Sequence, residues 1–379
     1  MKFIHTFSLM RYCEKDEIEA LRANYEENAF RYIRNEKLWM LIPYTNYGLK
    51  LVIKALPYDS KRRKFSKVYH SFEMIIYITP AKLLNPGECL GGLTSKVEIE
   101  KACAKLKELA NIIEKKSDVN ILSEACLWRV DLTKDQPTPS DLYSRELIAA
   151  LKKSIVKKGY HLYDPRTNDD YNVAWRQEDS MMFYNNNKRV GGKVYNKKRD
   201  LTLYKHHDEL IKIGDRGLLR FELSLLYQRL KEDYEAGGNM TCERLSEILW
   251  AVTNDSSMLF EKYFTQIFFP GIMVSRKLMK ANIKHLWPNK DKQLDQMMNY
   301  SDFITGKKIT NEKKMLSNQQ IAKRKTWFNE IGISPVALCR DCSYIPSVAD
   351  LLEDRNNVEL GEFLQDWTTM KFDFIYWKK

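Results

Sequence analysis

The chain has 379 residues, a formal net charge of +12 and a pI near 9.1. This length exceeds what one compact core usually organises, so we expect two domains or one domain with an appendage. The excess of lysine and arginine favours polyanionic partners and argues against an enzyme with an acidic surface.

The seven cysteines are odd in number and scattered, which predicts reduced thiols in a cytosol. Cys339 and Cys342 form one CxxC without a second pair at zinc-ribbon spacing, so free thiols and a structural zinc site both stay open. His5 and Arg11 interrupt the first apolar residues, and no apolar run approaches ~18 residues. We therefore expect a cytoplasmic protein without a membrane span.

The first half of the chain alternates between strand and helix patterns. Strand-like runs at 37–45, 48–56 and 71–80 predict an antiparallel sheet, and apolar residues spaced by three or four predict helices at 97–115 and 141–158. Further strand candidates are 127–132, 180–185, 193–197 and 219–225.

From about residue 227 the pattern becomes helical. Ser317 with Gln320 and Ser347 with Asp350 form capping boxes that begin two helices, whereas 284–315 has the weakest pattern and is interpreted as a linker. The predicted fold is α+β, an antiparallel sheet core with flanking helices followed by a helical C-terminal region. We expect a catalytic domain at 1–238 and a helical domain at 239–379 that binds DNA or packs against the first.

Three strand candidates carry charged side chains on one face when the two-residue period separates their faces. These side chains are Arg129 and Asp131, Lys193, Tyr195 and Lys197, and Arg220 and Glu222. A solvated sheet face explains any one of these strands. Their coincidence in one basic chain favours a shared polar surface that performs chemistry.

The residue types on this surface suit phosphoryl transfer. Carboxylates of Asp131, Glu222 and Asp200 could hold Mg²⁺ or Mn²⁺, which polarises a phosphodiester. The oxygen of Tyr195 could then displace a 3′-oxygen, provided that nearby cations and metal favour the phenolate over its usual pKa near ~10. The phosphate-binding cations would be Arg129, Lys193, Lys197 and Arg220.

Four short motifs occur in a characteristic order: "YITPAKLLNPGECLGG" (77–92), "WRVDLTKD" (128–135), "KVYNKKRDL" (193–201) and "LLRFELSL" (218–225). The ordered set resembles the phage and plasmid replication initiators of the gene II/X type, with a fainter likeness at 323–338. That family nicks one strand at an origin to start rolling-circle replication. The resemblance implies a Rep/relaxase-like nicking domain in which Tyr195 is the nucleophile, Lys197 and Asp200 belong to its motif, and Asp131 and Glu222 are the acids of the two strand motifs.

The chain departs from the wider rolling-circle superfamily in its histidines. No two histidines are separated by one hydrophobic residue, and His206 and His207 are adjacent, so either of them supplies one imidazole ligand or both are loop residues. Tyr184 and Tyr204 are the nearest candidates for a second nucleophile, and we interpret both as packing residues.

DNA recognition requires further cations. The basic segment 59–67, with Arg62 and Arg63, either tracks phosphates or is a solvated turn. The helix with Lys323 and Arg324 is either part of a helix-turn-helix-like reader or an ordinary packed helix. Lys198 and Arg199, within the tyrosine motif, complete the expected DNA contacts.

The sequence thus predicts a metal-dependent, site- and strand-specific endonuclease and ligase that forms a 5′-phosphotyrosyl intermediate. The expected partner is origin DNA, and the resemblance adds a host helicase and a DNA polymerase in a bacterial cell that carries the phage or plasmid. A non-catalytic origin-binding regulator and a conjugative relaxase with the same chemistry stay open as alternatives.

Overall fold

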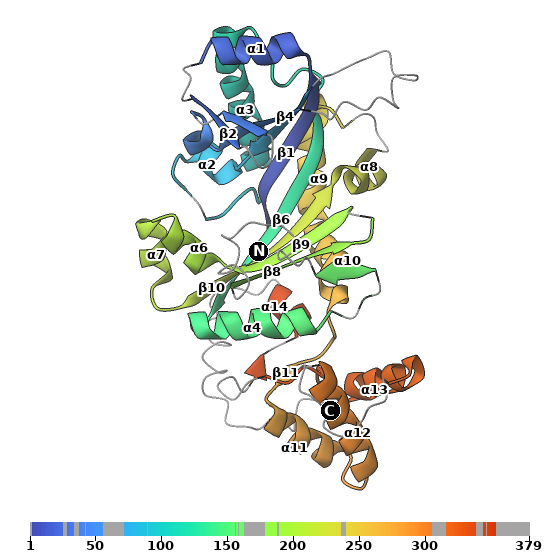
Figure 1. Ribbon diagram of the computed structural model, residues 1–379. Coiled ribbons are helices and arrows are strands. Elements are labelled where there is room, and N and C mark those ends of the chain that lie inside the picture. Colours follow the sequence, from blue (N-terminus) through green and yellow to red (C-terminus); the bar gives the residue numbers. More distant parts are fainter. Residues whose placement is uncertain are drawn as a thin grey trace, which may run out of the picture.

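The structure is a computed structural model (Figure 1). It describes residues 2–25, 29–33, 38–41, 43–55, 72–88, 90–155, 157, 159–162, 179–187, 189–235, 240–304, 316–338, 344–345 and 347–353. Arg62, Arg63 and the CxxC cysteines lie outside the described residues, so the predictions on them stay predictions.

Ten strands form one sheet in which every neighbouring pair is antiparallel. In sheet order they are β2 (Phe30–Ile33), β3 (Leu38–Leu41), β4 (Leu49–Ala55), β5 (Phe72–Ile78), β1 (Phe3–Cys13), β6 (Cys126–Thr138), β10 (Gly217–Leu226), β9 (Val190–Asn196), β8 (Ser180–Asn185) and β7 (Tyr160–Leu162). With the helices described next, this confirms the predicted α+β fold with an antiparallel sheet core.

The long strands β1, β6 and β10 form the middle of the sheet and have one strongly apolar face. Phe7 of β1, Val130 and Leu132 of β6 and Phe221 and Leu223 of β10 are all buried there. The intervening side chains point to the other face because strand residues alternate, and many of those are charged.

Helices cover the apolar face in a single hydrophobic cluster with the strands. The main ones are α3 (Lys96–Ser117), which begins at a Ser95–Glu98 capping box, α4 (Asp141–Lys153), α9 (Leu245–Asn254) and α10 (Ser256–Tyr263). Just after α10, Phe264 packs edge-on against Phe183 of β8 and Phe221 of β10, and these contacts hold the end of α10 against the two strands. The other helices on or beside the sheet are α1 (Lys15–Ala23), α2 (Pro80–Leu84), α6 (Lys197–Leu203), α7 (His207–Ile213), α8 (Tyr227–Tyr234) and α14 (Val348–Leu352).

A second hydrophobic cluster lies among α11 (Arg276–Leu286), α12 (Asp291–Ile304) and α13 (Asn318–Ile331), which gather at one end of the molecule (Figure 1). The linker interpretation of 284–315 was wrong for 291–304. Leu294, Met297 and Met298 recur at helical spacing and are buried in this cluster, which makes that segment a packed helix. The division into domains at 238/239 stays a prediction. No helix in the described part of the chain combines the length and the apolar character of a membrane span.

Candidate active site

The register of β9, β10 and β6 aligns the polar residues that the sequence singled out. Read across β9, β10 and β6, the rows of neighbours are Tyr195–Arg220–Asp135, Lys193–Glu222–Thr133 and Gly191–Ser224–Asp131. We call this surface the site face. Residues two apart share a face, so these three rows place a phenol, cations and carboxylates on the same side of the sheet.

Arg220 is the centre of the first row and is completely buried. Its Nε and Nη2 atoms donate to Oδ1 and Oδ2 of Asp135, both at 2.6 Å, and Nη1 lies 3.0 Å from Nε2 of His5. Burial alone would lower the pKa of Arg220, but the charge of Asp135 outweighs it and raises that pKa. Burial and the charges of Arg220 and Lys197 lower the pKa of His5 well below 6.5, so its imidazole is neutral at pH 7.

Tyr195 lies beside this buried ion pair with only 8% of its surface exposed. The ammonium of Lys193 sits 3.9 Å from the centroid of its ring, a cation–π contact. Burial raises the pKa of Tyr195 by more than Arg220 lowers it, so the side chain is a neutral phenol in this structure. The surrounding cations therefore do not by themselves favour the phenolate.

Asp131 and Glu222, which we call the carboxylate pair, are bridged by Arg129. Arg129 Nε donates to Oδ1 of Asp131 at 2.6 Å, and its Nη2 lies 3.7 Å from Oε1 of Glu222. Asp131 also accepts hydrogen bonds from Ser224 Oγ at 2.7 Å and from Thr6 Oγ1. Burial and the charge of Asp131 raise the pKa of Glu222. The pair thus shares one cation, and a proton binds Glu222 more readily than it binds an ordinary glutamate.

The predicted strand 193–197 was one residue too long, because β9 ends at Asn196. The Asn196 side chain accepts a hydrogen bond from the backbone N–H of Arg199 at 3.1 Å and so caps α6, of which Lys197 is the first residue. Although Lys197 lies outside the strand, its side chain is buried, with 7% of its surface exposed, and its Nζ donates to Oδ2 of Asp200 at 2.8 Å. Burial, followed by the charge of Arg220, lowers the pKa of Lys197.

The three predicted acids, Asp131, Glu222 and Asp200, do not form one metal-binding group in the described part of the chain. Asp200 lies with Lys197, and no three Asp, Glu, His or Cys side chains of the described ranges form a metal-binding group. Mg²⁺ commonly takes one or two carboxylates and completes its shell with waters and substrate phosphates. The pair at Asp131 and Glu222 offers such a donor set, with Arg129 between them in this structure.

The other predicted DNA contacts differ in accessibility. Lys198 Nζ donates to the carbonyls of Gly214 and Arg216, which fixes α6 to the loop after α7. Arg199 forms an ion pair with buried Asp179 at 2.9 Å. In α13, Arg324 is buried whereas Lys323 is exposed.

The two alternative tyrosines and the histidine pair lie in different surroundings. Tyr184 of β8 is opposite Gly191 and thus extends the third row of the site face, whereas Tyr204 is largely exposed at the end of α6. His206 precedes α7 and His207 begins it, and neither joins a metal-binding group within the described ranges.

Sequence reasoning missed three members of the site: His5 and Thr6 on β1 and Asp135 on β6, whereas the two-residue period of 219–225 already places Ser224 on the face of Arg220 and Glu222. Asp135 was detectable, because it continues the two-residue period from Asp131 beyond the predicted end of that strand at 132. His5 and Thr6 carry no local signal, since their place depends on β1 pairing with β6, from which Thr6 faces Asp131.

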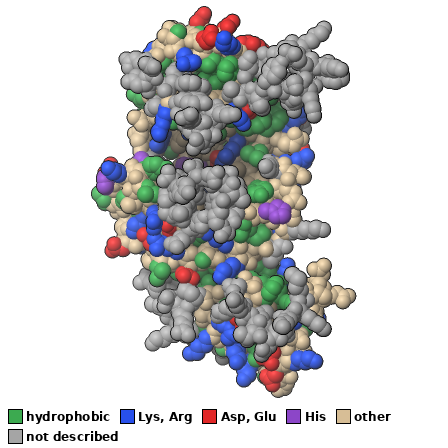
Figure 2. Space-filling view, viewed as in Figure 1, with side chains coloured by type: hydrophobic (Ala, Val, Ile, Leu, Met, Phe, Trp, Pro, Cys, Tyr) green, Lys and Arg blue, Asp and Glu red, His purple; other side chains and the backbone are tan. Residues whose placement is uncertain are grey.

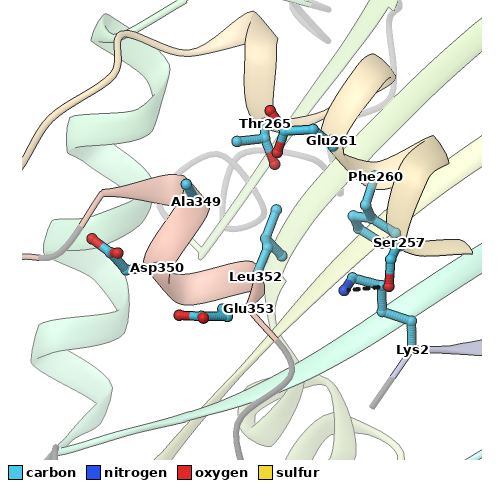
Figure 3. Close-up of a pocket in the computed structure, with 9 residues that line it drawn as sticks. All are labelled: Lys2, Ser257, Phe260, Glu261, Thr265, Ala349, Asp350, Leu352 and Glu353. Atoms are coloured by element: carbon cyan, nitrogen blue, oxygen red, sulfur yellow. Dashed lines mark hydrogen bonds between the residues drawn. The ribbon is translucent and has the colours of Figure 1, made fainter.

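A cavity of about 530 Å³ lies elsewhere, between Lys2, α10 and α14 (Figure 3). Lys2 Nζ donates to Ser257 Oγ at 3.3 Å on its wall, and Phe260 and Leu352 line it. None of the residues of the three rows borders this cavity, so it is separate from the site face.

Comparisons with known proteins add little to this geometry. No protein-family model and no curated protein matches the chain. Among solved structures, the chain is similar to a rolling circle replication initiator protein from Geobacillus stearothermophilus, with a TM-score of 0.29 and 10% identity over 69% of this chain and 84% of that chain. At this TM-score the likeness carries no argument, so the function has to be argued from the site.

Proposed function

We propose that the protein is a rolling-circle replication initiator that nicks one DNA strand through Tyr195 and keeps the 5′ end as a phosphotyrosyl ester. The observation that carries the proposal is the cross-strand register. It places Tyr195 beside Arg220 and, one row away, Lys193 beside Glu222. Three of the four ordered sequence motifs, 128–135, 193–201 and 218–225, contribute residues to this surface, which supports the resemblance to the gene II/X type initiators.

The chemistry is a transesterification. Tyr195 Oη attacks the phosphorus, a bond from phosphorus to Oη forms, and the bond from phosphorus to the 3′-oxygen breaks. The phenol proton passes to a base and the leaving 3′-oxygen takes up a proton.

The cations divide into two roles. Arg220 is fully engaged by Asp135 and His5, so it acts as a fixed charge that stabilises negative charge as it develops on Tyr195. Lys193 and Arg129 are partly exposed and can contact the scissile phosphate. A divalent cation held by the carboxylate pair would neutralise the phosphodiester oxygens.

The non-catalytic alternative is favoured by one observation. Tyr195 is a covered neutral phenol, and Asp131 already accepts from three donors. A regulator that binds the origin without cutting would have such a site permanently, whereas a nickase must change it when DNA binds. A relaxase would share the chemistry and differ in acting at a transfer origin.

The proposal is tested with single-stranded fragments of the element that encodes the protein, labelled at the 3′ end and incubated with Mn²⁺. We expect a labelled protein band whose label maps to the peptide that contains Tyr195. Tyr195→Phe should abolish the band and leave DNA binding unchanged, whereas the matched substitutions Tyr184→Phe and Tyr204→Phe should retain it. A band of equal intensity from the Tyr195→Phe protein would refute the assignment.

A further inference from the structure

Helix α11 presents a row of lysines on its outer face. Lys277, Lys280 and Lys284 are spaced by three and four residues and are all exposed, whereas Met279 and Ile283 are buried against α12 and α13. At a rise of about 1.5 Å per residue, the three lysines span roughly 10 Å along the helix.

Two further lysines lie beside a tryptophan pair that joins the end of α11 to α13. Trp287, the residue after α11, meets Trp327 of α13 edge-to-face with ring centroids 6.2 Å apart. Lys290 lies 5.0 Å from the Trp287 ring and Lys323 lies 5.2 Å from the Trp327 ring. Two more ammonium groups therefore lie against this aromatic pair.

We call these five lysines the basic strip. Across the described residues no carboxylate forms an ion pair with Lys277, Lys280, Lys284, Lys290 or Lys323. Arg276 at the start of the same helix, by contrast, is held by Asp302 of α12 with bonds of 2.9 and 2.8 Å. Figure 2 shows lysine and arginine side chains gathered over α11 at this end of the molecule, next to a group of acidic ones.

We propose that the basic strip binds the phosphate backbone of duplex DNA and so anchors the origin while the site face acts on a single strand. This rests on the proposed function. A duplex carries one negative charge per about 1.7 Å of axis, so roughly six phosphate charges lie along the ~10 Å of the lysine row. A straight row of cations on a rigid helix matches such a regular charged backbone.

The two tryptophans favour a duplex over a single strand. Single-strand binding surfaces offer open aromatic faces on which bases stack. Here each ring is half-buried, packed against the other, and has a lysine against it. The rings therefore order the lysines and leave little surface for a base, so the recognition is electrostatic and independent of sequence.

The test is the salt dependence of binding to a fluorescent duplex of arbitrary sequence. In the triple variant Lys277→Gln, Lys280→Gln and Lys284→Gln, the slope of log K against log salt should become shallower by about 2.7, since each lost phosphate contact removes about 0.9. The matched control replaces Lys101, Lys107 and Lys115 of α3 with Gln. These lysines are exposed at the other end of the molecule, and the control removes the same total charge.

An equal change of slope in both triple variants would overturn the proposal, because it would reflect net charge alone. Wild-type binding to polyglutamate that matches duplex binding and is lost in the α11 variant would also overturn it, in favour of an acidic protein partner. The covalent adduct on single-stranded DNA is measured in the same proteins and should survive in the α11 variant. If wild-type protein forms no adduct but the slopes differ as expected, the nickase proposal fails and the duplex surface stands.

Discussion

The buried ion pair of Arg220 and Asp135 can be tested by removing the charge of Asp135 and measuring the loss of stability. Asp135→Asn keeps the size of the side chain and removes its charge. The guanidinium of Arg220, which has no exposed surface, then loses its counter-ion, and the two hydrogen bonds that measure 2.6 Å in the wild type are weakened. Breaking one partner of a buried pair costs about 3–5 kcal/mol, because the remaining charge is uncompensated. At about 2.1 cal/mol/K of unfolding entropy per residue, a chain of 379 residues loses roughly 4–6 °C in melting temperature for that cost.

The chain contains its own control for this experiment. Arg276 and Asp302 form the same two-bond arrangement at 2.9 and 2.8 Å, but 44% of the Arg276 side chain is exposed. Asp302→Asn should cost about 0–1 kcal/mol, since water solvates the arginine that is left. Both variants are compared with wild type by urea denaturation followed by circular dichroism.

The double variant Asp135→Asn with Arg220→Met removes the buried charge as well, and should recover most of the lost stability. If Asp135→Asn destabilises the protein no more than Asp302→Asn does, the reasoning from burial is refuted. The site would then have enough water to solvate Arg220, and this arginine would stabilise negative charge on Tyr195 only weakly.

Three further predictions concern the same region. In the folded protein the pKa of His5 is below its usual value near 6.5, so the unfolded chain binds the proton first and the free energy of unfolding should fall as the pH drops below about 6.5. In His5→Gln the loss of stability against urea between about pH 7.5 and about pH 5.5 should be smaller than in wild type. An unchanged loss would contradict the assignment. Gly192→Ala would place a Cβ 2.1 Å from the Phe183 ring, so the free energy of unfolding should fall by about 1–3 kcal/mol in the same denaturation assay. An unchanged free energy of unfolding would show that the ring moves aside freely. Arg129→Gln removes the guanidinium between Asp131 and Glu222, so this variant should bind Mn²⁺ more tightly than wild type does, as measured by electron paramagnetic resonance without DNA. Lys193→Gln removes an equal charge near the carboxylate pair but leaves Arg129 in place. An equal gain in Mn²⁺ affinity in both variants would contradict direct competition between Arg129 and the metal ion.

The sequence was most informative in strands where apolar and polar residues alternate strictly. Period-two patterns in β6, β9 and β10 predicted which side chains share a face, and they needed no knowledge of the pairing. They could not give the order of the strands. That order brings Asp135 to Arg220, and it brings β1, with His5 and Thr6, next to β6.

Two local errors have plain physical causes. Lys197 fits the two-residue period of the strand pattern, but the Asn196 side chain accepts from the free backbone N–H of Arg199 in the first turn of α6 and so ends the strand. The helix at 291–304 was missed because methionines and a polar surface weaken its pattern, and it forms by packing on its neighbours. Burial was also invisible in the sequence. Arg324 and Arg220 read as solvent-facing cations, yet both are buried.

The pairing of β6 with β10 has a consequence for the biosynthesis of the protein. β6 ends at Thr138 and β10 begins at Gly217, so a nascent chain carries the acids of β6 long before their partner strand is translated. Until then β6 presents an unpaired edge that can join a foreign strand. Such distant pairings form slowly and favour aggregation of partly folded chains. Chains truncated before residue 217 should therefore be insoluble and unable to cut DNA, because the site comes together only when three remote parts of the polypeptide meet.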